Sequence, residues 1–309
     1  MIEVVFPPDI KSSEYYLLCV SEITETDLEL QGRLNEISND VDAAWKLFDL
    51  RVTPKQFHMF EALLPPVRKR RPRRKKVENP EGEPMVEPVV EPVIVAGAAS
   101  KADFVRLYER YMLLGNKEPR LVYDLLRAAS HNVCALCGII KATSLDHYLP
   151  KARYPIFSIN PKNLVPACTP CNTIKGDPIY HSESDLHLYP YNDDAKFYNT
   201  DWIDASITVV DDMLSFDFFP NPPEHWSEIE KDRVRTHFRT FELHDKYKNN
   251  SMQLITSIMF NIRRILVGGD YLEVSAYFLD NMKVVPCNST FRIMYKAVAN
   301  DIDICSGNF

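Results

Sequence analysis

Three short stretches of the chain decide its fold: CALC at residues 134–137, LDHYLPK at 145–151 and NLVPACTPCNTIK at 163–175. They contain two C-x-x-C pairs, separated by 30 residues: Cys134 with Cys137, and Cys168 with Cys171. Two such pairs can place four thiolates tetrahedrally around one Zn²⁺. The alternative is two redox or buried C-x-x-C pairs, but redox pairs normally lie beside a thioredoxin-like βαβ pattern, which this sequence lacks. The sequence therefore predicts a structural zinc site.

The residues between and after the cysteines are those that phosphodiester hydrolysis needs. A zinc with four cysteine ligands is coordinatively closed, so any chemistry must come from the residues that it holds in place. Asp146 and His147 are adjacent in a segment expected to be extended, and neighbouring side chains of a strand point to opposite faces. Asn172 follows at the expected start of a helix, with Lys175 one turn further on the same face. His147 suits a general base, the oxygens of Asp146 and Asn172 suit Mg²⁺ or Mn²⁺, and Lys175 suits a phosphate contact.

The combined pattern C-x-x-C, D-H-x-x-P-K and N-L-x-x-x-C-x-x-C-N-x-x-K resembles the HNH endonuclease family, in its zinc-stabilised, four-cysteine branch. The resemblance extends over residues 134–177, about a seventh of the chain. It implies a ββα-metal fold, in which a two-stranded ribbon packs on the helix that begins near Cys171. One departure is RYPIF at 153–157, where family members often have a glycine-rich connection.

The resemblance also implies roles for single residues. His147 matches the general base, and Asp146 matches a ligand of the catalytic divalent metal. Asn163, on the second strand, matches the position that orients the catalytic histidine. Asn172 matches the third catalytic position, which also ligates the metal. Asparagine at both later positions favours Mg²⁺ or Mn²⁺ over a transition metal.

The composition of the whole chain is that of an ordinary globular protein. Its 309 residues are 45% hydrophobic and 26% charged, and the net charge is -7. That charge argues against a general nucleic-acid coat protein, but a nuclease needs only a local basic surface. No apolar run approaches the roughly 18–20 residues of a membrane span, and the amino terminus has no signal-peptide pattern. We therefore expect a cytoplasmic protein with no membrane partner. Four of its seven cysteines, those of the two C-x-x-C pairs, are expected to bind metal rather than form disulfides, and Cys19, Cys287 and Cys305 are expected to be buried thiols.

Changes in composition divide the chain into four parts. Residues 1–64 are expected to form a small N-terminal domain without an assigned role. Residues 65–100 are expected to form a flexible linker, because the basic run RKRRPRRKK at 68–76 is followed by three Glu-Pro steps. Residues 101–224 hold the HNH domain with a helical lead-in, and residues 225–309 form a helical C-terminal region. The predicted fold class is α+β: a ββα-metal centre within a mostly α-helical body, with the small N-terminal segment on its Pro/Glu-rich linker.

The function expected from these patterns is a metal-dependent endonuclease that hydrolyses DNA, with Lys175, Arg153 and Lys151 contacting the nucleic acid. The alternative is a non-catalytic zinc-knuckle module that binds nucleic acid or a protein partner. A pure binding module needs no metal-and-base set, so Asp146-His147 together with Asn172 separates the two. More loosely, the layout is similar to the HNH subunits of Septu and retron-associated anti-phage systems, which work with an ATPase. That similarity implies a role in bacterial defence and a regulatory partner subunit.

Other features allow two interpretations each. The basic run at 68–76 suits phosphate contacts or a solvated tether. His181 and His187 either approach the catalytic metal or are ordinary loop histidines. An aromatic group either stacks nucleic-acid bases or packs against the ββα unit, and packing is the expected role; its members are Tyr189, Tyr191, Phe197, Tyr198 and Trp202. Further along, residues 203–219 are expected to form two strands joined by a turn at Asp211-Asp212, and an apolar stripe at 255–266 predicts a helix.

Overall fold

The computed structural model describes residues 2–52, 55–63, 93–115 and 117–309. The basic run at 68–76 and most of the predicted linker lie outside these residues. The last part of that linker is folded: β1 (Ile94–Ala96) pairs antiparallel with β2 (Ala99–Ser100), and Ala99 is buried. Within the described residues helix and sheet are mixed and helix predominates, which confirms the α+β class.

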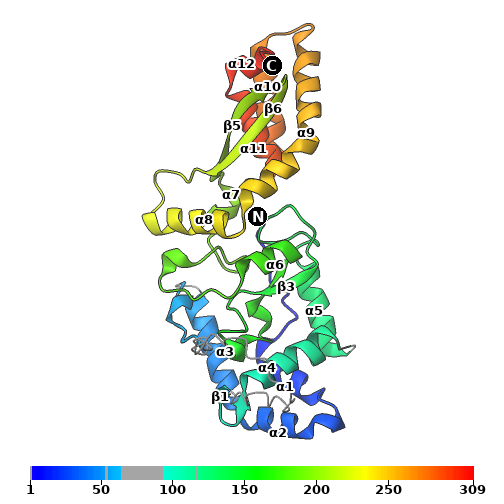
Figure 1. The fold of residues 1–309 in the computed structure, drawn as a ribbon, viewed down its shortest axis with the longest axis vertical. Helices are drawn as coiled ribbons and strands as arrows, with labels where there is room; N and C mark the ends of the chain where they lie inside the picture. The colour runs from blue at the N-terminus through cyan, green and yellow to red at the C-terminus, as the bar shows by residue number, and fades with distance from the viewer. Residues whose placement is uncertain (1, 53–54, 64–92, 116) are drawn as a thin grey trace, which may run out of the picture.

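The N-terminal segment packs against the helices that follow the predicted linker (Figure 1). Its elements are α1 (Ser12–Ser21), η1 (Glu25–Asp27), α2 (Leu28–Glu36), α3 (Ser38–Val52) and η2 (Phe57–Met59). The later helices are α4 (Lys101–Arg106), the π-helical η3 (Leu107–Leu113) and α5 (Glu118–Ala128). Hydrogen bonds join the N-terminal helices to the later ones. The Tyr15 hydroxyl donates to the carbonyl of Pro119 (2.9 Å), and the Tyr111 hydroxyl donates to Asp27 (2.6 Å). Residues 2–52 and 55–63 therefore share a core with the other parts of the chain that the structure describes.

A two-stranded ribbon and a short helix form the part that carries the cysteine and Asp-His motifs. β3 (Ser144–His147) pairs antiparallel with β4 (Leu164–Ala167), so that Asp146 lies opposite Val165. The strands are connected through η4 (Pro155–Phe157) and η5 (Pro161–Asn163). Helix α6 (Thr169–Lys175) follows β4 directly and packs on β3. Pro170 lies in its first turn, where the missing N–H removes no helical hydrogen bond.

The other end of the molecule consists of a hairpin and helices (Figure 1). β5 (Ile203–Val210) pairs with β6 (Met213–Pro220), and Asp211 and Asp212 both have the positive φ that a two-residue type I′ turn requires, which confirms the predicted hairpin. The hairpin packs on α9 (Leu243–Leu266) and α11 (Thr290–Ala299), both in the region assigned to 225–309. The remaining elements are η6 (Glu183–Asp185), α7 (Lys196–Asn199), α10 (Tyr271–Lys283) and α12 (Ile302–Cys305). The predicted apolar stripe lies on α9, where residues 255, 258, 259 and 262 are buried.

Helix α8 (Glu228–Thr240) lies between the two ends of the molecule (Figure 1). It begins with a capping box, in which Ser227 and Glu230 each bind the other's backbone N–H. Its buried Arg233 donates to both carboxylate oxygens of Asp193, at 2.9 and 2.8 Å, and Lys55 lies 3.1 Å from the same carboxylate. Burial opposes the ionisation of Asp193, but the two cations outweigh it and hold the pKa of that carboxyl below its usual range. This ion pair fixes α8 to the loop that precedes the hairpin.

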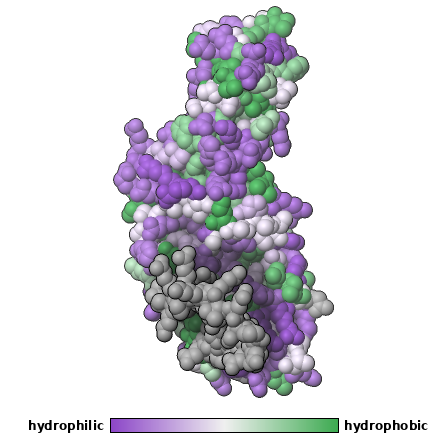
Figure 2. Space-filling model, in the orientation of Figure 1, coloured by the Kyte–Doolittle hydropathy of each residue, from purple (hydrophilic) through white to green (hydrophobic). Residues whose placement is uncertain are grey.

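On the face of the molecule that Figure 2 shows, hydrophilic and apolar residues are interspersed, and the apolar ones appear in separate groups. Across residues 2–52, 55–63, 93–115 and 117–309, no helix combines the length and the apolar character that crossing a membrane requires.

Candidate metal centre and active site

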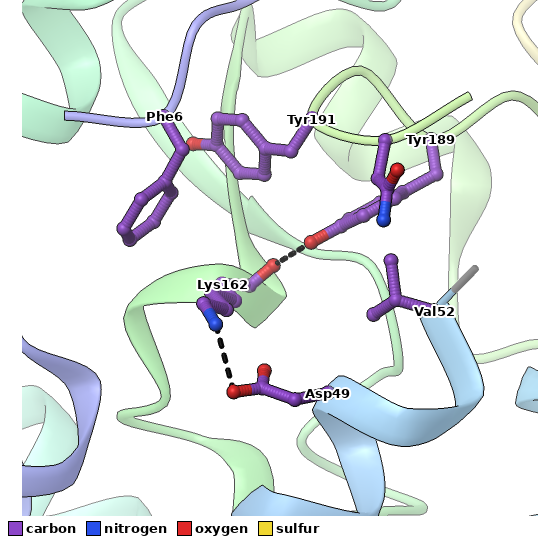
Figure 3. A pocket seen from close by; sticks show the side chains of 7 residues that line it. Phe6, Asp49, Val52, Lys162, Tyr189 and Tyr191 are labelled. Carbon is purple, nitrogen blue, oxygen red and sulfur yellow. Dashed lines mark hydrogen bonds and ion pairs between the residues drawn. The ribbon is translucent and has the colours of Figure 1, made fainter. Parts of the chain in front are cut away.

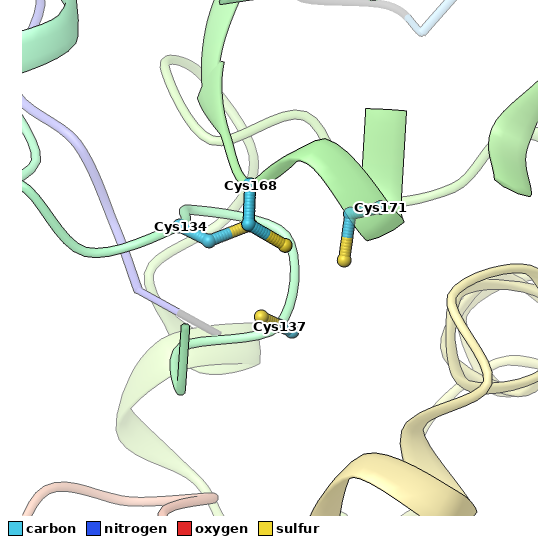
Figure 4. Close-up of side chains that lie close together, drawn as sticks. All are labelled: Cys134, Cys137, Cys168 and Cys171. Atoms are coloured by element: carbon cyan, nitrogen blue, oxygen red, sulfur yellow. The ribbon is translucent and has the colours of Figure 1, made fainter. Parts of the chain in front are cut away.

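Four cysteine side chains converge between the loop before β3 and the start of α6 (Figure 4). All four are buried, and their sulfur atoms lie within 4.8 Å of one another. A tetrahedral zinc with Zn–S bonds of about 2.3 Å requires sulfurs about 3.8 Å apart, so this donor set fits a structural zinc. Hydrogen bonds among the thiols lower the pKa of Cys137 and raise the pKa values of Cys134 and Cys171. Zinc binding would release the protons that remain, because the thiolate is the metal ligand.

Backbone hydrogen bonds shape each cysteine pair. In the first pair, the N–H of Gly138 donates to the carbonyl of Cys134 (2.8 Å), and the N–H of Cys134 donates to Ile140 (2.8 Å). Gly138 has a φ of 69°, a left-handed conformation that glycine adopts at little cost. In the second pair, the carbonyl of Cys168 accepts the N–H of Asn172 (3.0 Å) as α6 begins. The predicted convergence of the four cysteines is thereby confirmed.

Two distant parts of the chain also hold the first cysteine pair. The N–H of Ile2 donates to the carbonyl of Ala135 (3.3 Å). His237, on α8, donates from Nε2 to the carbonyl of Leu136 (2.7 Å), while its Nδ1 accepts the N–H of Leu188 (3.2 Å). Burial lowers the pKa of His237 to about 3, in agreement with a neutral ring that uses one nitrogen as donor and the other as acceptor. The cysteine region is therefore tied to the amino-terminal segment and to α8.

His147 ends β3 as a buried and oriented imidazole. Its Nε2 lies 2.8 Å from the carbonyl oxygen of Ser158, and the Ser158 hydroxyl donates to the carbonyl of Phe104 (3.2 Å). The ring of Tyr108 lies against the imidazole, with centroids 4.5 Å apart and planes at 68°. Burial lowers the pKa of His147 to about 3, so the ring is neutral at neutral pH. Since Nε2 donates to Ser158, the lone pair is on Nδ1, which has no hydrogen-bond partner among the described residues.

Asp146 faces α6 and is paired with Lys175. The Lys175 ammonium donates to Oδ2 of Asp146 and to the carbonyl of His147, and it lies 3.4 Å from the carbonyl of Tyr148. The two paired side chains are only 4% and 1% exposed. Burial raises the pKa of Asp146 and lowers that of Lys175, although each group opposes the shift of the other. Lys175 was expected to contact phosphate, but its ammonium points inward and its three N–H groups have protein acceptors.

Asn172 lies on the same face of β3 as Asp146. Its Nδ2 donates to the Ser144 hydroxyl (3.2 Å) and to the carbonyl of Leu145 (3.4 Å). Its Oδ1 has no hydrogen-bond partner in the part of the chain that the structure describes, and it is available as a ligand. Carboxylate and amide oxygens are the donors that Mg²⁺ prefers, and Mg²⁺ needs few protein ligands because waters and phosphate complete its shell. The donor set of Asp146 and Asn172 therefore fits a hard divalent cation in its chemistry.

Asn163 braces the loop that follows His147. It is fully buried, and its Oδ1 accepts the N–H of Leu149 (2.7 Å). Its Nδ2 donates to the carbonyls of Leu149 (3.0 Å) and Phe157 (3.1 Å). The amide thus holds both ends of the loop that leads to Ser158, whose carbonyl binds His147. Any effect of Asn163 on the imidazole passes through this loop.

Lys151 and Arg153, both expected to contact nucleic acid, have different surroundings. Lys151 lies above the face of Tyr108, with Nζ 4.7 Å from the ring centroid, and pairs with Glu109 at 2.7 Å. Its side chain is 30% exposed, so it presents a cation on the Tyr108 side of His147. Arg153 donates to the carbonyls of Leu63 (3.3 Å) and Asp177 (3.4 Å), which ties the same loop to the end of the N-terminal segment.

The remaining sequence candidates are structural. His187 is buried, with Nδ1 3.1 Å from the Tyr180 hydroxyl, and burial holds its pKa well below the usual value. His181 is exposed, and its backbone N–H binds Asp185 (3.0 Å). The aromatic group packs as expected: its members at 189, 197, 198 and 202 are buried and the one at 191 is packed against the core.

A pocket beside η5 is lined by aromatic rings and one ion pair (Figure 3). The ammonium of Lys162 binds Asp49 at 2.7 Å, and the Tyr189 hydroxyl donates to the carbonyl of Lys162 (2.6 Å). Phe6 and Tyr191 form its apolar wall, with ring centroids 5.3 Å apart. None of the residues that line this pocket belongs to the cysteine cluster or to the Asp-His pair.

Three residues that contact these sites were not predicted as site residues: Tyr108, Ser158 and His237. Tyr108 contributed only to the apolar spacing of a helix in the sequence. Neither Ser158 nor His237 belongs to a spaced motif, and only tertiary packing brings them to the cysteine and Asp-His segments.

The comparisons with known proteins give one relative and no family. Protein ea31 of Escherichia phage lambda is 28% identical to this chain over 229 aligned residues, which cover 69% of this chain and 77% of that protein. No family model matches the chain. No solved structure matches it. The name of the phage protein describes no activity, so any function must be argued from the site.

Proposed function

We propose that this chain is a metal-dependent nuclease of the HNH kind, which hydrolyses phosphodiester bonds. The observation that carries the proposal is the pair at the end of β3, where a buried carboxylate and an oriented, neutral imidazole lie on opposite faces. The four-cysteine cluster fixes this ribbon to α6. A module that only binds nucleic acid or protein gains nothing from such a pair.

In this proposal His147 takes a proton from the attacking water at Nδ1. The hydrogen bond from Nε2 to the Ser158 carbonyl keeps Nδ1 unprotonated beforehand and stabilises the imidazolium that forms. An approaching phosphate brings negative charge to the ring, and a nearby opposite charge raises the pKa of an imidazole from the low value that burial imposes. Lys151, which is partly exposed on the Tyr108 side of His147 and pairs with Glu109, would exchange that partner for the phosphate.

Asp146 and Asn172 are the residues that would hold the catalytic cation. Bound there, Mg²⁺ or Mn²⁺ would neutralise charge on the phosphate and on the leaving oxygen. Lys175 balances the charge of Asp146 and occupies its Oδ2, which limits the number of carboxylate oxygens that a ligand can use.

DNA is the proposed substrate, and bacterial anti-phage defence with an ATPase partner is the proposed setting. The substrate rests on the resemblance of the motif to HNH endonucleases, and the setting rests on the similarity of the chain's layout to the HNH subunits of anti-phage systems. Affinity purification of the chain from its native host tests the setting: a stoichiometric ATPase supports it, and recovery of the chain alone contradicts it.

The decisive experiment compares DNA cleavage by the wild type and by His147→Ala, with the zinc-loaded chain in Mg²⁺ or Mn²⁺. A general base contributes about 10²–10⁴-fold, so His147→Ala should lose activity by that factor. His181→Ala, which removes an exposed histidine, is the matched control and should cleave like the wild type. Equal cleavage by wild type and His147→Ala would refute the mechanism. Tight DNA binding without cleavage in every metal would favour the alternative, a zinc module that only binds.

A further inference from the structure

Helix α4, with its π-helical continuation η3, reaches His147 from two directions. Through Phe104, in α4, it binds the Ser158 hydroxyl (3.2 Å), and the carbonyl of the same Ser158 accepts the hydrogen of His147 Nε2 (2.8 Å). Through Tyr108, in η3, it lays an aromatic ring against the imidazole at 4.5 Å between centroids. Both contacts come from residues outside the HNH-like segment.

The backbone of η3 is π-helical over Leu107–Leu113, and the next N–H, of Leu114, donates to the carbonyl of Glu109 five residues earlier (3.1 Å). π-Helical turns are rare in proteins, and those that do occur often lie at functional sites. Here the segment turns two aromatic side chains inward: Tyr108 to His147, and Tyr111 to Asp27. The second of these contacts lies away from the Asp-His pair and offers an internal control.

The ring of Tyr108, rather than its hydroxyl, makes the relevant contacts. Tyr108 is 5% exposed, and its hydroxyl has no hydrogen-bond partner within residues 2–52, 55–63, 93–115 and 117–309. The Tyr108 ring packs against the imidazole of His147, and the ammonium of Lys151 lies over the face of the Tyr108 ring, 4.7 Å from its centroid. The ring therefore sets the spacing between the proposed base and the cation nearest to it.

We infer that Tyr108 is a positioning residue for His147, an inference that rests on the proposed nuclease function. The hydrogen bond to Ser158 holds one end of the imidazole, and the Tyr108 ring blocks rotation of the other end. Together they keep the free Nδ1 aimed to one side, where it can take a proton from a water held in a fixed position. A displacement of about 1 Å at such a group costs about 10²-fold in rate.

The kinetic test uses Tyr108→Leu, Tyr108→Phe and the control Tyr111→Phe. Tyr108→Leu should lower kcat about 10–100-fold and change KM by less than about 3-fold, because it disturbs the base more than substrate binding. Tyr108→Phe keeps the ring and should restore kcat to within about 2-fold of the wild type. Tyr108→Met serves as a second ring-free variant, with a longer and unbranched side chain of similar volume, if the leucine variant is unstable. Wild-type kcat in a folded ring-free variant would overturn the inference.

A spectroscopic test does not depend on cleavage. Long-range ¹H–¹⁵N spectra of the zinc-loaded chain report the tautomer of each histidine, and His147→Gln assigns the signal of His147. The wild type and Tyr108→Phe should show a single Nε2–H tautomer, whereas Tyr108→Leu should show averaged nitrogen shifts. A single unchanged tautomer in Tyr108→Leu contradicts the positioning role. If the wild type never cleaves DNA but Tyr108→Leu still changes the nitrogen shifts of His147, the positioning role stands and the nuclease proposal alone is contradicted.

Discussion

Loss of the zinc is expected to unfold the ribbon and helix that carry the Asp-His pair. Each of β3 and β4 has four residues and α6 has seven. An isolated two-stranded ribbon is marginally stable at best, and helices shorter than about 12–15 residues are marginal in water. A structural zinc contributes about 10–16 kcal/mol of apparent binding energy, whereas a whole domain is typically stable by about 5–15 kcal/mol. The metal is thus expected to decide whether this unit folds.

The perturbation is chelation of the wild type, or Cys171→Ser, which removes one buried ligand from within α6. We expect about one zinc per wild-type chain by elemental analysis, and a fall in Tm of more than about 10 °C after chelation or substitution. Hydrogen exchange should accelerate across residues 134–175. The control is Cys287→Ser, since Cys287 is a partly exposed cysteine outside the cluster. A chelated chain with the wild-type melting curve, or far less than one zinc per chain, would refute the reasoning.

Three further predictions follow from buried or charged contacts. Arg233→Leu leaves the carboxylate of Asp193 buried without its main partner and should destabilise the fold by about 3–5 kcal/mol in urea titrations. The pKa of Asp193 in the folded protein is depressed, so the ion pair stabilises the fold fully above the ordinary Asp pKa of about 3.9. This stabilisation is lost as the pH falls through the folded pKa, so the difference in stability between the wild type and Arg233→Leu should shrink in acid. Asn163→Ala leaves the buried N–H and the carbonyl of Leu149 unpaired, while the Phe157 carbonyl keeps the N–H of Asn160; it should cost about 2–4 kcal/mol and reduce cleavage while zinc content is retained. Lys151→Ala should weaken DNA binding and lower the slope of log affinity against log salt by about 1, unlike Lys162→Ala in the pocket of Figure 3.

Matched variants distinguish these effects from general loss of structure. Arg235→Leu removes an arginine from an exposed ion pair on the same helix, and should change stability by less than about 1 kcal/mol. Asn163→Asp keeps an acceptor for the Leu149 N–H and should be milder than the alanine variant. Equal losses of stability in Arg233→Leu and Arg235→Leu, or in Asn163→Ala and Asn163→Asp, would count against the assigned contact. For Lys151→Ala, an unchanged slope of log affinity against log salt would do the same.

The parts of the fold that local chemistry dictates could be predicted from the sequence. Two C-x-x-C pairs bring four sulfurs together because each pair forms one tight turn, and the structure has that cluster. The hairpin follows from Asp211-Asp212, since aspartate tolerates the positive φ that the turn requires. The apolar stripe of α9 follows from its helical period.

Contacts between distant segments could not be predicted in the same way. The basic character of Lys175 favours a phosphate contact, but its inward direction depends on how α6 packs on β3 and on three acceptors that only the folded ribbon supplies. Tyr108 fits an apolar helical stripe whether or not a histidine lies beside it. The π-helical backbone of η3 leaves no separate mark in the sequence, because its apolar spacing also fits an α-helix.

The hydrogen bond from His237 to Leu136 also constrains the order in which the protein can be completed during synthesis. The cysteine region leaves the ribosome well before α8 exists. At about 5–20 residues per second, the ribosome needs several seconds to add the segment between Cys171 and His237. During that interval the nascent chain holds all four sulfurs but lacks its C-terminal tie. The first cysteine pair therefore acquires this hydrogen bond only after α8 has been synthesised, while α9 to α12 are still to follow.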